Sequence, residues 1–258
     1  MHNSGEVYGG ILALLFAAAA GLVGSFALMK RMLLASDVIS HVALPGLGLA
    51  YLLGFNPLLG GGASLFLGTL LIWQLQKSSG LDTEATIGVV FAAALGIGTA
   101  LTPREDLVEA LFGSFQTLSL FTFLLGVGGV LLIIAVIFRF KDQLLVSLFA
   151  PELAAATGVP VSRLNLYFLL TFSLTVLVGL RFMGALLAGA LVILPAATGR
   201  RLASNVSQFV VSSCLASVAA VVLGFLINIY MLPRISLGPV VIIVSAVFFA
   251  LSMFKKRA

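Results

Sequence analysis

The sequence predicts an all-α fold, a polytopic membrane helical bundle with eight or nine transmembrane helices. Of the 258 residues, 61% are hydrophobic and only 9% are charged, whereas soluble domains carry about a quarter charged residues. The hydrophobic residues also form runs of roughly twenty, the length that an α-helix needs to cross the hydrocarbon core of a bilayer. The length of the chain fits a single transmembrane domain, residues 1–258.

The first apolar run, residues 7–28, is long enough to span a bilayer, and no basic segment precedes it. We therefore expect it to remain as the first membrane helix and not to be cleaved as a signal peptide. The run 183–197 is short for a full crossing, so eight spans with one partly re-entrant segment is the alternative to nine. The runs after the first are residues 38–55, 58–75, 85–101, 117–138, 164–180, 183–197, 209–227 and 235–254.

The loop charges predict an orientation in the membrane. Eleven of the fourteen Lys and Arg residues fall on one side of the expected bundle, and only Arg104, Arg181 and Arg234 fall on the other. Because Lys and Arg accumulate in cytoplasmic loops, the N-terminus is expected outside and the C-terminus inside. The bilayer thus accounts for the net charge of +5, and no basic patch is left for nucleic acid. The acidic residues expected in the outer loop are Glu105, Asp106 and Glu109.

Small residues are frequent within the runs and predict close helix packing. One cluster is Gly60-Gly61-Gly62-Ala63-Ser64. Another is the pair Gly184 and Ala188, at a spacing that lets two helix backbones approach each other in a membrane. Tight packing explains such residues without any ligand role.

The connection between the fifth and sixth runs contains the pattern of a short helix, residues 149–160. Pro151 suits the first helical turn, Glu152 suits the positive end of the helix dipole, and Gly158 followed by Pro160 ends the helix. On this spacing alone, a docking element for a soluble partner and a simple loop helix are equally good interpretations.

Asp37 and His41 lie four residues apart at the start of the second run. This spacing puts two helical side chains on one face. Because an ionisable residue is costly at the edge of hydrocarbon, such a pair indicates a substrate or ion pathway. The alternative is structural, with Asp37 capping the helix and His41 donating to a helix carbonyl.

The segment around this pair resembles a known signature. Residues 30–46 match the Asp-x-x-Ser-His-x-x-Leu-Pro-Gly pattern of the membrane permeases of zinc, manganese and iron ATP-binding cassette (ABC) importers. Further matches follow in the same order and cover most of the chain. The signature residues are Asp37, Ser40, His41, Leu44, Pro45 and Gly46, and the further matches are residues 83–91, 111–114, 149–154 with Gly158, and 190–197.

The resemblance implies a type II ABC importer permease, related in architecture to the cobalamin and siderophore importers. It implies a homodimer with a two-fold pore in the bacterial cytoplasmic membrane. Two ATPase subunits would dock on the cytoplasmic side, and an extracytoplasmic metal-binding protein would deliver the ion. Two positions depart from the family pattern, since Ala150 stands where an aspartate is usual and Gly199 where an alanine is usual. The residues that match the coupling helix of the family are Pro151, Glu152, Ala154 and Gly158.

The donor chemistry agrees with this resemblance. A carboxylate and an imidazole suit divalent ions such as Zn, Mn or Fe, whereas a sulfur-rich site would retain them. In a two-fold dimer, Asp37 and His41 of both subunits would supply four donors. Apart from this transported ion, we expect no cofactor in the chain.

Other classes of protein find little support in the sequence. The chain contains no Gly-x-x-x-x-Gly-Lys-Ser/Thr pattern, so ATP would be hydrolysed by a partner chain and this subunit is not expected to be an enzyme. The single cysteine, Cys214, excludes an intrachain disulfide. Two alternatives remain, an ion-coupled secondary carrier in which Asp37 and His41 relay protons and an intramembrane enzyme in which the same pair is catalytic. Such a carrier would be expected to keep more charges inside its bundle.

Overall fold

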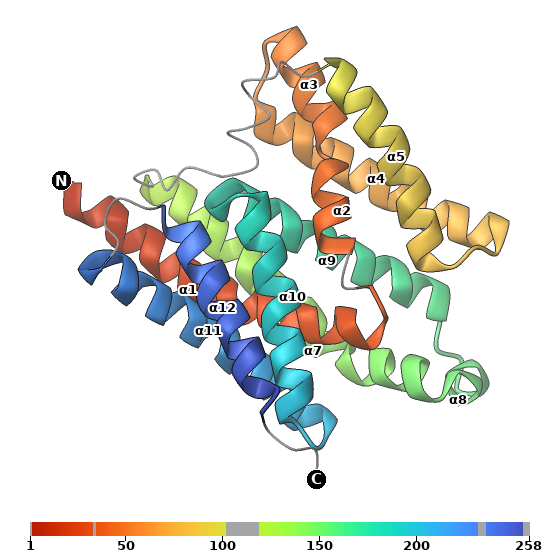
Figure 1. Cartoon of the computed structure of the whole chain (residues 1–258). Coiled ribbons are helices and arrows are strands. Elements are labelled where there is room, and N and C mark those ends of the chain that lie inside the picture. Colours follow the sequence, from red (N-terminus) through yellow and green to blue (C-terminus); the bar gives the residue numbers. More distant parts are fainter. Residues whose placement is uncertain (1, 33–34, 102–118, 232–235, 255–258) are drawn as a thin grey trace. The chain divides into compact units, whose positions relative to one another are not determined.

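The structure is a computed structural model that describes residues 2–32, 35–101, 119–231 and 236–254. Regular structure in these ranges is α-helical (Figure 1), which confirms the predicted fold class. The helices are α1 (His2–Met29), α2 (Ala35–His41), α3 (Leu44–Leu53), α4 (Pro57–Ser79), α5 (Thr83–Leu101), α7 (Leu120–Phe149), α8 (Pro151–Ala156), α9 (Val161–Met183), α10 (Ala185–Leu202), α11 (Val206–Tyr230) and α12 (Leu237–Ser252).

Eight of the nine apolar runs each correspond to one helix among the described residues, but fewer of the runs are full spans than predicted. Among the described residues, six helices are long and apolar enough to cross a membrane: α1, α4, α5, α7, α9 and α11. By this measure the prediction of eight or nine spans is slightly too high. The run 38–55 is divided between α2 and α3, and the 16 residues of α12 extend only about 24 Å, less than a hydrocarbon core of roughly 30 Å.

Helix α7 extends past the predicted run 117–138 into the connection between the fifth and sixth runs. Its 30 residues extend about 45 Å, well beyond the roughly 30 Å of hydrocarbon. Arg139 and Lys141 mark the level at which the helix leaves the apolar region. The helix then continues to Phe149, and Leu144 in this extension is buried at 2% exposure. Together with α8, the extension makes most of the connection between the fifth and sixth runs helical.

The helices form two compact units. Unit 1 contains residues 1–33, 109–131 and 178–258, and unit 2 contains residues 34–108 and 132–177. Helices α1, α10, α11 and α12 pack against one another in unit 1, whereas α2, α3, α4 and α5 pack together in unit 2. Helices α7 and α9 contribute residues to both units.

In unit 1, small residues allow α1 to contact the backbones of α10 and α11. A Cβ on Gly21 would lie 2.7 Å from the carbonyl oxygen of Ser213, and one on Gly24 would collide with the Val192 carbonyl. The thiol of Cys214 donates to the Ala18 carbonyl at 3.4 Å. Gly21 and Gly24, which the sequence did not single out, thus allow close helix packing in unit 1.

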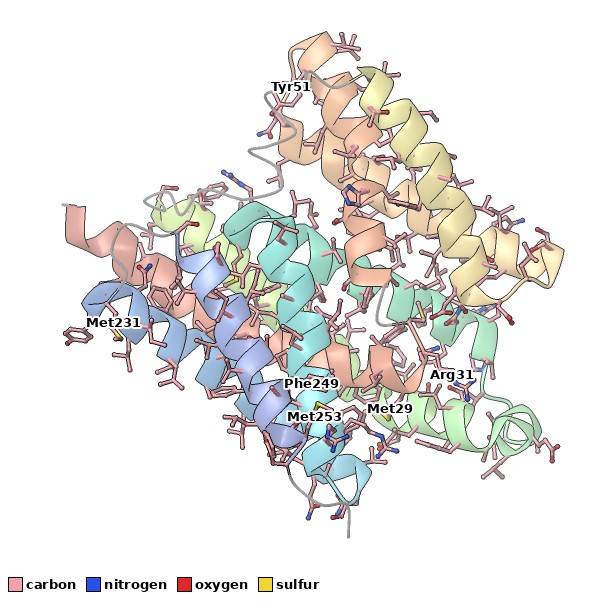
Figure 2. The ribbon with its side chains drawn as sticks, in the orientation of Figure 1. Met29, Arg31, Tyr51, Met231, Phe249 and Met253 are labelled. Carbon is pink, nitrogen blue, oxygen red and sulfur yellow. The ribbon has the colours of Figure 1, made fainter. Side chains whose placement is uncertain are left out.

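The C-terminal end of α1 has a strained turn. The N–H of Arg31 donates to the Leu28 carbonyl at 3.1 Å, and that of Met32 donates to the Ala27 carbonyl at 2.8 Å. This pattern is a Schellman motif, whose first residue past the helix is usually glycine because it takes a left-handed conformation. Arg31 occupies that position with φ of 59°, and Figure 2 shows its side chain near the end of α1.

In unit 2, glycines bring α3 and α5 close to their neighbours. A Cβ on Gly46 of α3 would collide with the Gly60 carbonyl of α4. A Cβ on Gly98 of α5 would lie 3.2 Å from the Pro45 nitrogen. The Gly60 cluster predicted from sequence as a packing surface therefore contacts the segment that follows His41.

Candidate functional site

Helix α2 carries both candidate metal-binding residues. Asp37 and His41 lie one helical turn apart in this seven-residue helix. The helix is anchored by Ala35 and Ile39, which are 4% and 1% exposed. His41 is half-buried at the C-terminal end of the helix. The predicted spacing of the pair on one helix is thus retained.

The helical path is interrupted directly after His41. The N–H of Val42 donates to the Ile39 carbonyl at 3.0 Å, and that of Ala43 donates to the Ser40 carbonyl at 3.2 Å. These bonds tighten the last turn of α2. Pro45 has no N–H to donate to the His41 carbonyl four residues earlier, which prevents a regular α-helix from continuing through this point. His41 therefore lies at a break between two apolar helices, a place where membrane transporters commonly bind ions.

Phe91 of α5 holds the imidazole of His41. The two ring centroids are 5.6 Å apart, and the ring planes meet at 58°. A tilted pair at this separation is favourable for aromatic rings. The contact limits the directions that the imidazole can take while one side of His41 stays accessible.

The Leu44-Pro45-Gly46 part of the signature is structural. Pro45 lies in the first turn of α3, where its missing N–H is tolerated. Leu44 packs on Gly98 of α5, and Gly46 packs on Gly60 of α4. These three residues position the break after His41 against both neighbouring helices.

A pocket of about 500 Å³ lies beside this segment, between α3, α4 and α5. Its lining includes Val42, Pro45 and Gly46 and is apolar except for Ser64. The Ser64 hydroxyl donates to the Val42 carbonyl at 2.7 Å, so it is already used within the protein. His41 is not among the described lining residues. The chemistry of this pocket does not fit a metal ion.

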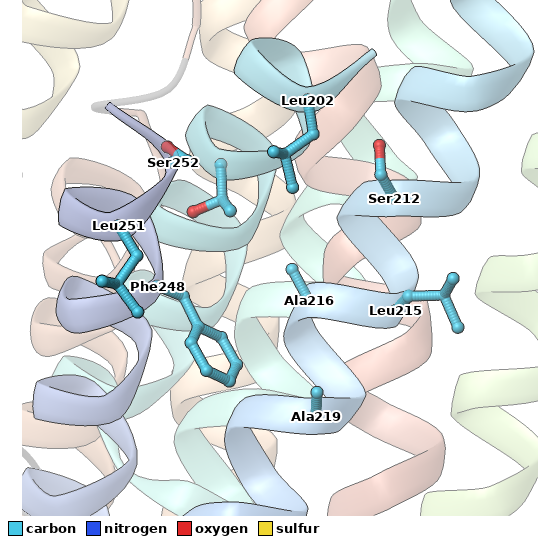
Figure 3. Close-up of a pocket in the computed structure, with 9 residues that line it drawn as sticks. Leu202, Ser212, Leu215, Ala216, Ala219, Phe248, Leu251 and Ser252 are labelled. Carbon is cyan, nitrogen blue, oxygen red and sulfur yellow. The ribbon is translucent and has the colours of Figure 1, made fainter. Parts of the chain in front are cut away.

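A second pocket, of about 450 Å³, lies in unit 1 between α10, α11 and α12. Figure 3 shows its lining, in which Phe248 and Leu251 lie across from Ala216 and Ala219. Its three hydroxyl groups all donate hydrogen bonds to backbone carbonyls of their own helices. Thr198 donates to Leu194, Ser212 to Gln208 and Ser252 to Phe249. This pocket also does not fit a cation.

One copy of the chain supplies few metal donors. Within the residues that the structure describes, no three His, Cys, Asp or Glu side chains gather closely enough to hold a metal ion. Glu84 lies exposed in the first turn of α5, as expected for a residue that favours the helix dipole. The acidic loop residues Glu105, Asp106 and Glu109, and the match at residues 111–114, lie outside the described residues.

The predicted helix at residues 149–160 is present as α8, Pro151–Ala156. Ala154 is fully buried, whereas Glu152 is exposed. Gly158 ends the helix with φ of 72°, a conformation that glycine adopts readily. Two large apolar side chains next to Glu152 are exposed to solvent, Phe149 at 66% and Leu153 at 54%.

Three features near these sites were not predicted. Phe91 was part of a matched segment but had no assigned role. The pairing of Gly46 with Gly60 needs the fold. Gln76 of α4 and Asn165 of α9 form a hydrogen bond of 2.9 Å across 89 positions in sequence. Asn165 lies within the apolar run 164–180, and an amide in such a run is a signal for this kind of bond.

Comparisons with known proteins identify the family. The profile of the ABC 3 transport family matches residues 8–256. The manganese import system permease protein ScaB of Streptococcus parasanguinis is 33% identical over 252 residues, which cover 95% of this chain and 88% of that protein. The zinc uptake system membrane protein ZnuB of Haemophilus influenzae is 28% identical over 242 residues, with 91% of each chain covered.

A solved structure has the same fold. PsaBC from Streptococcus pneumoniae, determined in complex with a Fab, matches with a TM-score of 0.80 and 28% identity, and the match covers 95% of this chain and 90% of that chain. The chain therefore belongs to the ABC 3 transport family, as a non-catalytic, multi-pass permease subunit of an ABC importer in the bacterial cytoplasmic membrane, and a separate subunit hydrolyses ATP.

Proposed function

We propose that this permease passes a divalent transition metal ion, zinc, manganese or iron, and that Asp37 and His41 bind the ion in transit. The observation that carries the proposal is the position of His41, half-buried at a helix break, one turn after Asp37. The similarity to permeases named for manganese and zinc import supports this cargo. Apart from the transported ion, no cofactor is proposed for the chain.

The donor set suits an ion that must be released. Carboxylate oxygen and neutral imidazole nitrogen bind first-row divalent ions, while thiolates, which would hold zinc more firmly, play no part. Phe91 restricts the imidazole at a ring distance of 5.6 Å, which reduces the freedom that His41 would lose when it binds an ion. Such a site can bind an ion with moderate affinity and still release it.

We further propose that two copies form a two-fold homodimer. Two donors from one chain leave a transition metal short of the four ligands that zinc usually takes. A two-fold axis near α2 doubles the set to two carboxylates and two imidazoles. The dimer thus completes a coordination shell that one chain only begins. The whole chain, residues 1–258, is one permease domain in this proposal.

The α8 segment is proposed as the coupling helix that receives the ATPase subunits on the cytoplasmic side. Helix α7 carries it past the charged residues Arg139 and Lys141, and the side chains of Phe149 and Leu153 are exposed there. Exposed apolar side chains on a water-facing surface indicate a protein contact. Pro151 and Glu152 begin the helix, Ala154 anchors it and Gly158 ends it. An extracytoplasmic metal-binding protein would deliver the ion to the opposite face.

Uptake of radiolabelled Zn²⁺, Mn²⁺ or Fe²⁺ tests the proposal in proteoliposomes that contain the permease with its ATPase and binding protein. We expect His41→Ala and Asp37→Ala to lose uptake while the complex still assembles. His2→Ala is the matched control, because His2 begins α1 and is not part of α2, so its loss should leave uptake unchanged. Uptake retained by His41→Ala would refute the site. Uptake that follows a proton gradient without ATP would instead indicate a secondary carrier.

A further inference from the structure

Five polar side chains join α4, α5 and α9 in unit 2. We call them the polar clamp. Trp73 and Gln76 come from α4, Thr83 begins α5, and Ser162 and Asn165 lie in the first turns of α9. Four of the five are half-buried, and Ser162 is exposed. The clamp therefore forms at an edge of the helix packing and not in its interior.

The bonds of the clamp converge on Gln76. Its amide oxygen accepts from the side-chain amide of Asn165 at 2.9 Å, and its amide nitrogen donates to the Thr83 hydroxyl. The indole N–H of Trp73 donates to the Ser162 carbonyl at 2.9 Å. One side chain, Gln76, thus ties the start of α9 to the start of α5.

On one side, the clamp adjoins the coupling helix proposed above. The N–H of Val159 donates to the Ala154 carbonyl at 3.0 Å, and the N–H of Leu164 donates to the Pro160 carbonyl at 2.9 Å. Only four residues, 157–160, separate α8 from α9. A displacement of α8 therefore reaches the first turn of α9 through a short, hydrogen-bonded connection.

On the other side, the clamp adjoins the residues around the metal site. Thr83 is the first residue of α5, and Phe91 follows eight positions later in the same helix, about 12 Å along its axis. Phe91 contacts the ring of His41. Further along α5, Gly98 lies against Leu44 and Pro45. A shift of α5 would therefore act on both sides of the break after His41.

Among the described contacts, Gln76 is the side chain of the clamp that is bonded to both α9 and α5. Trp73 connects α4 to α9 only, and the Phe91 contact connects α5 to α2 only. Gln76 is bonded on both sides through a single amide group. A side chain without hydrogen-bonding groups would keep the helices packed and remove both bonds.

We propose that Gln76 is a positioning residue that transmits the movement of α8 to α5 and thereby to His41. The proposal rests on the coupling role of α8 given under the proposed function. Energetic coupling between two sites is measured by how a change at one alters the response at the other. The test therefore measures how much metal is moved for each ATP hydrolysed.

The experiment compares Gln76→Leu with wild type in proteoliposomes that contain the full importer, with ATP hydrolysis and uptake of radiolabelled metal measured together. We expect hydrolysis within about twofold of wild type and metal moved per ATP reduced about tenfold, a size that coupling between distant sites reaches. Gln74→Leu is the matched control. Gln74 is exposed on the same helix and its side chain makes none of the described hydrogen bonds, since Ser78 bonds only to its backbone carbonyl, so its replacement should leave the ratio unchanged.

Two further variants test the same inference if Gln76→Leu assembles poorly. Thr83→Val keeps the shape of the side chain and removes only the acceptor of the Gln76 amide, so it should lower the ratio in the same direction. The double variant with Gln76→Leu and Asn165→Leu should lower the metal moved per ATP little more than Gln76→Leu alone, because both changes remove the same hydrogen bond.

The outcomes separate the inference from the proposed function. A normal ratio of metal to ATP in Gln76→Leu overturns the inference while wild-type uptake stands. A parallel fall of hydrolysis, uptake and melting temperature also overturns it, because that result indicates a purely structural role. If the wild-type complex moves no metal with ATP, the proposed function fails and the inference fails with it.

Discussion

The ring of His41 in α2 lies 5.6 Å from the ring of Phe91 in α5. This contact predicts that Phe91→Leu weakens metal binding without abolishing it. A tilted aromatic pair contributes about 0.5–1.5 kcal/mol, so the affinity should fall by up to about tenfold. Titration of the purified permease with Mn²⁺ or Zn²⁺ measures the change. Phe121→Leu, at an exposed aromatic of α7, is the control, and an unchanged affinity in Phe91→Leu would contradict the role of the contact.

Gly46→Ala is expected to destabilise the protein. The added methyl group would collide with the Gly60 carbonyl, so α3 and α4 would have to separate. Overpacking of this kind costs about 1–3 kcal/mol, and thermal unfolding in detergent should show a lower melting temperature. Gly128→Ala is a good comparison, because no atom lies within 4 Å of a Cβ built there and alanine favours a helix. Equal melting temperatures for the two variants would contradict the close packing.

Arg31→Gly is expected to stabilise the protein. Arg31 holds φ of 59° at the end of α1, a conformation that costs a non-glycine residue about 1–2 kcal/mol. Arg31→Ala removes the same charge but keeps the strained Cβ, so it separates strain from electrostatics. Thermal unfolding should place Arg31→Gly above wild type and Arg31→Ala at or below it. A melting temperature for Arg31→Gly no higher than that for Arg31→Ala would remove strain as the explanation.

Lys30 predicts a pH dependence of stability. Burial lowers the pKa of Lys30 to about 8 from its ordinary value of 10.5. The unfolded chain therefore binds more protons than the folded chain between pH 8 and 10.5, so the folded state gains stability as the pH rises through that window. Below pH 8 both states are protonated and the cost of burial is fully present. Lys30→Met should lose this rise, which melting curves at pH 7 and pH 10 would reveal. The same rise in both proteins would assign it to other groups.

Leu153→Asp is expected to weaken the attachment of the ATPase subunit. Leu153 is 54% exposed on α8 beside Glu152, and loss of a central apolar contact commonly costs an interface about 2 kcal/mol or more. Co-purification of the ATPase with the tagged permease should fall at least about tenfold. Leu81→Asp is the control, because Leu81 is similarly exposed, at 49%, in the connection between α4 and α5. Equal retention of the ATPase by both variants would argue against α8 as the docking helix.

The helices could be predicted from the sequence because the cause of helix formation in a membrane is local. Backbone groups in hydrocarbon must pair within their own segment, so an apolar run of sufficient length becomes a helix. The Pro151 to Gly158 pattern located α8 for a similar reason, since the start and stop signals of a helix act on neighbouring residues. The end of α7 was not predicted, because charged residues interrupt the apolar run at Arg139 while the helix continues to Phe149.

The sequence alone established the membrane class, the pairing of Asp37 with His41 on one helix and the family signature, because each depends on residues close together in the chain. Only the tertiary structure revealed the ring contact of Phe91 with His41 and the close approach of Gly46 to Gly60. The same holds for the hydrogen bonds that join Gln76 to Asn165 and to Thr83. Contacts between membrane helices depend on where small and polar side chains meet across distant segments. These contacts depend on how whole helices pack together, and no short stretch of sequence specifies that packing.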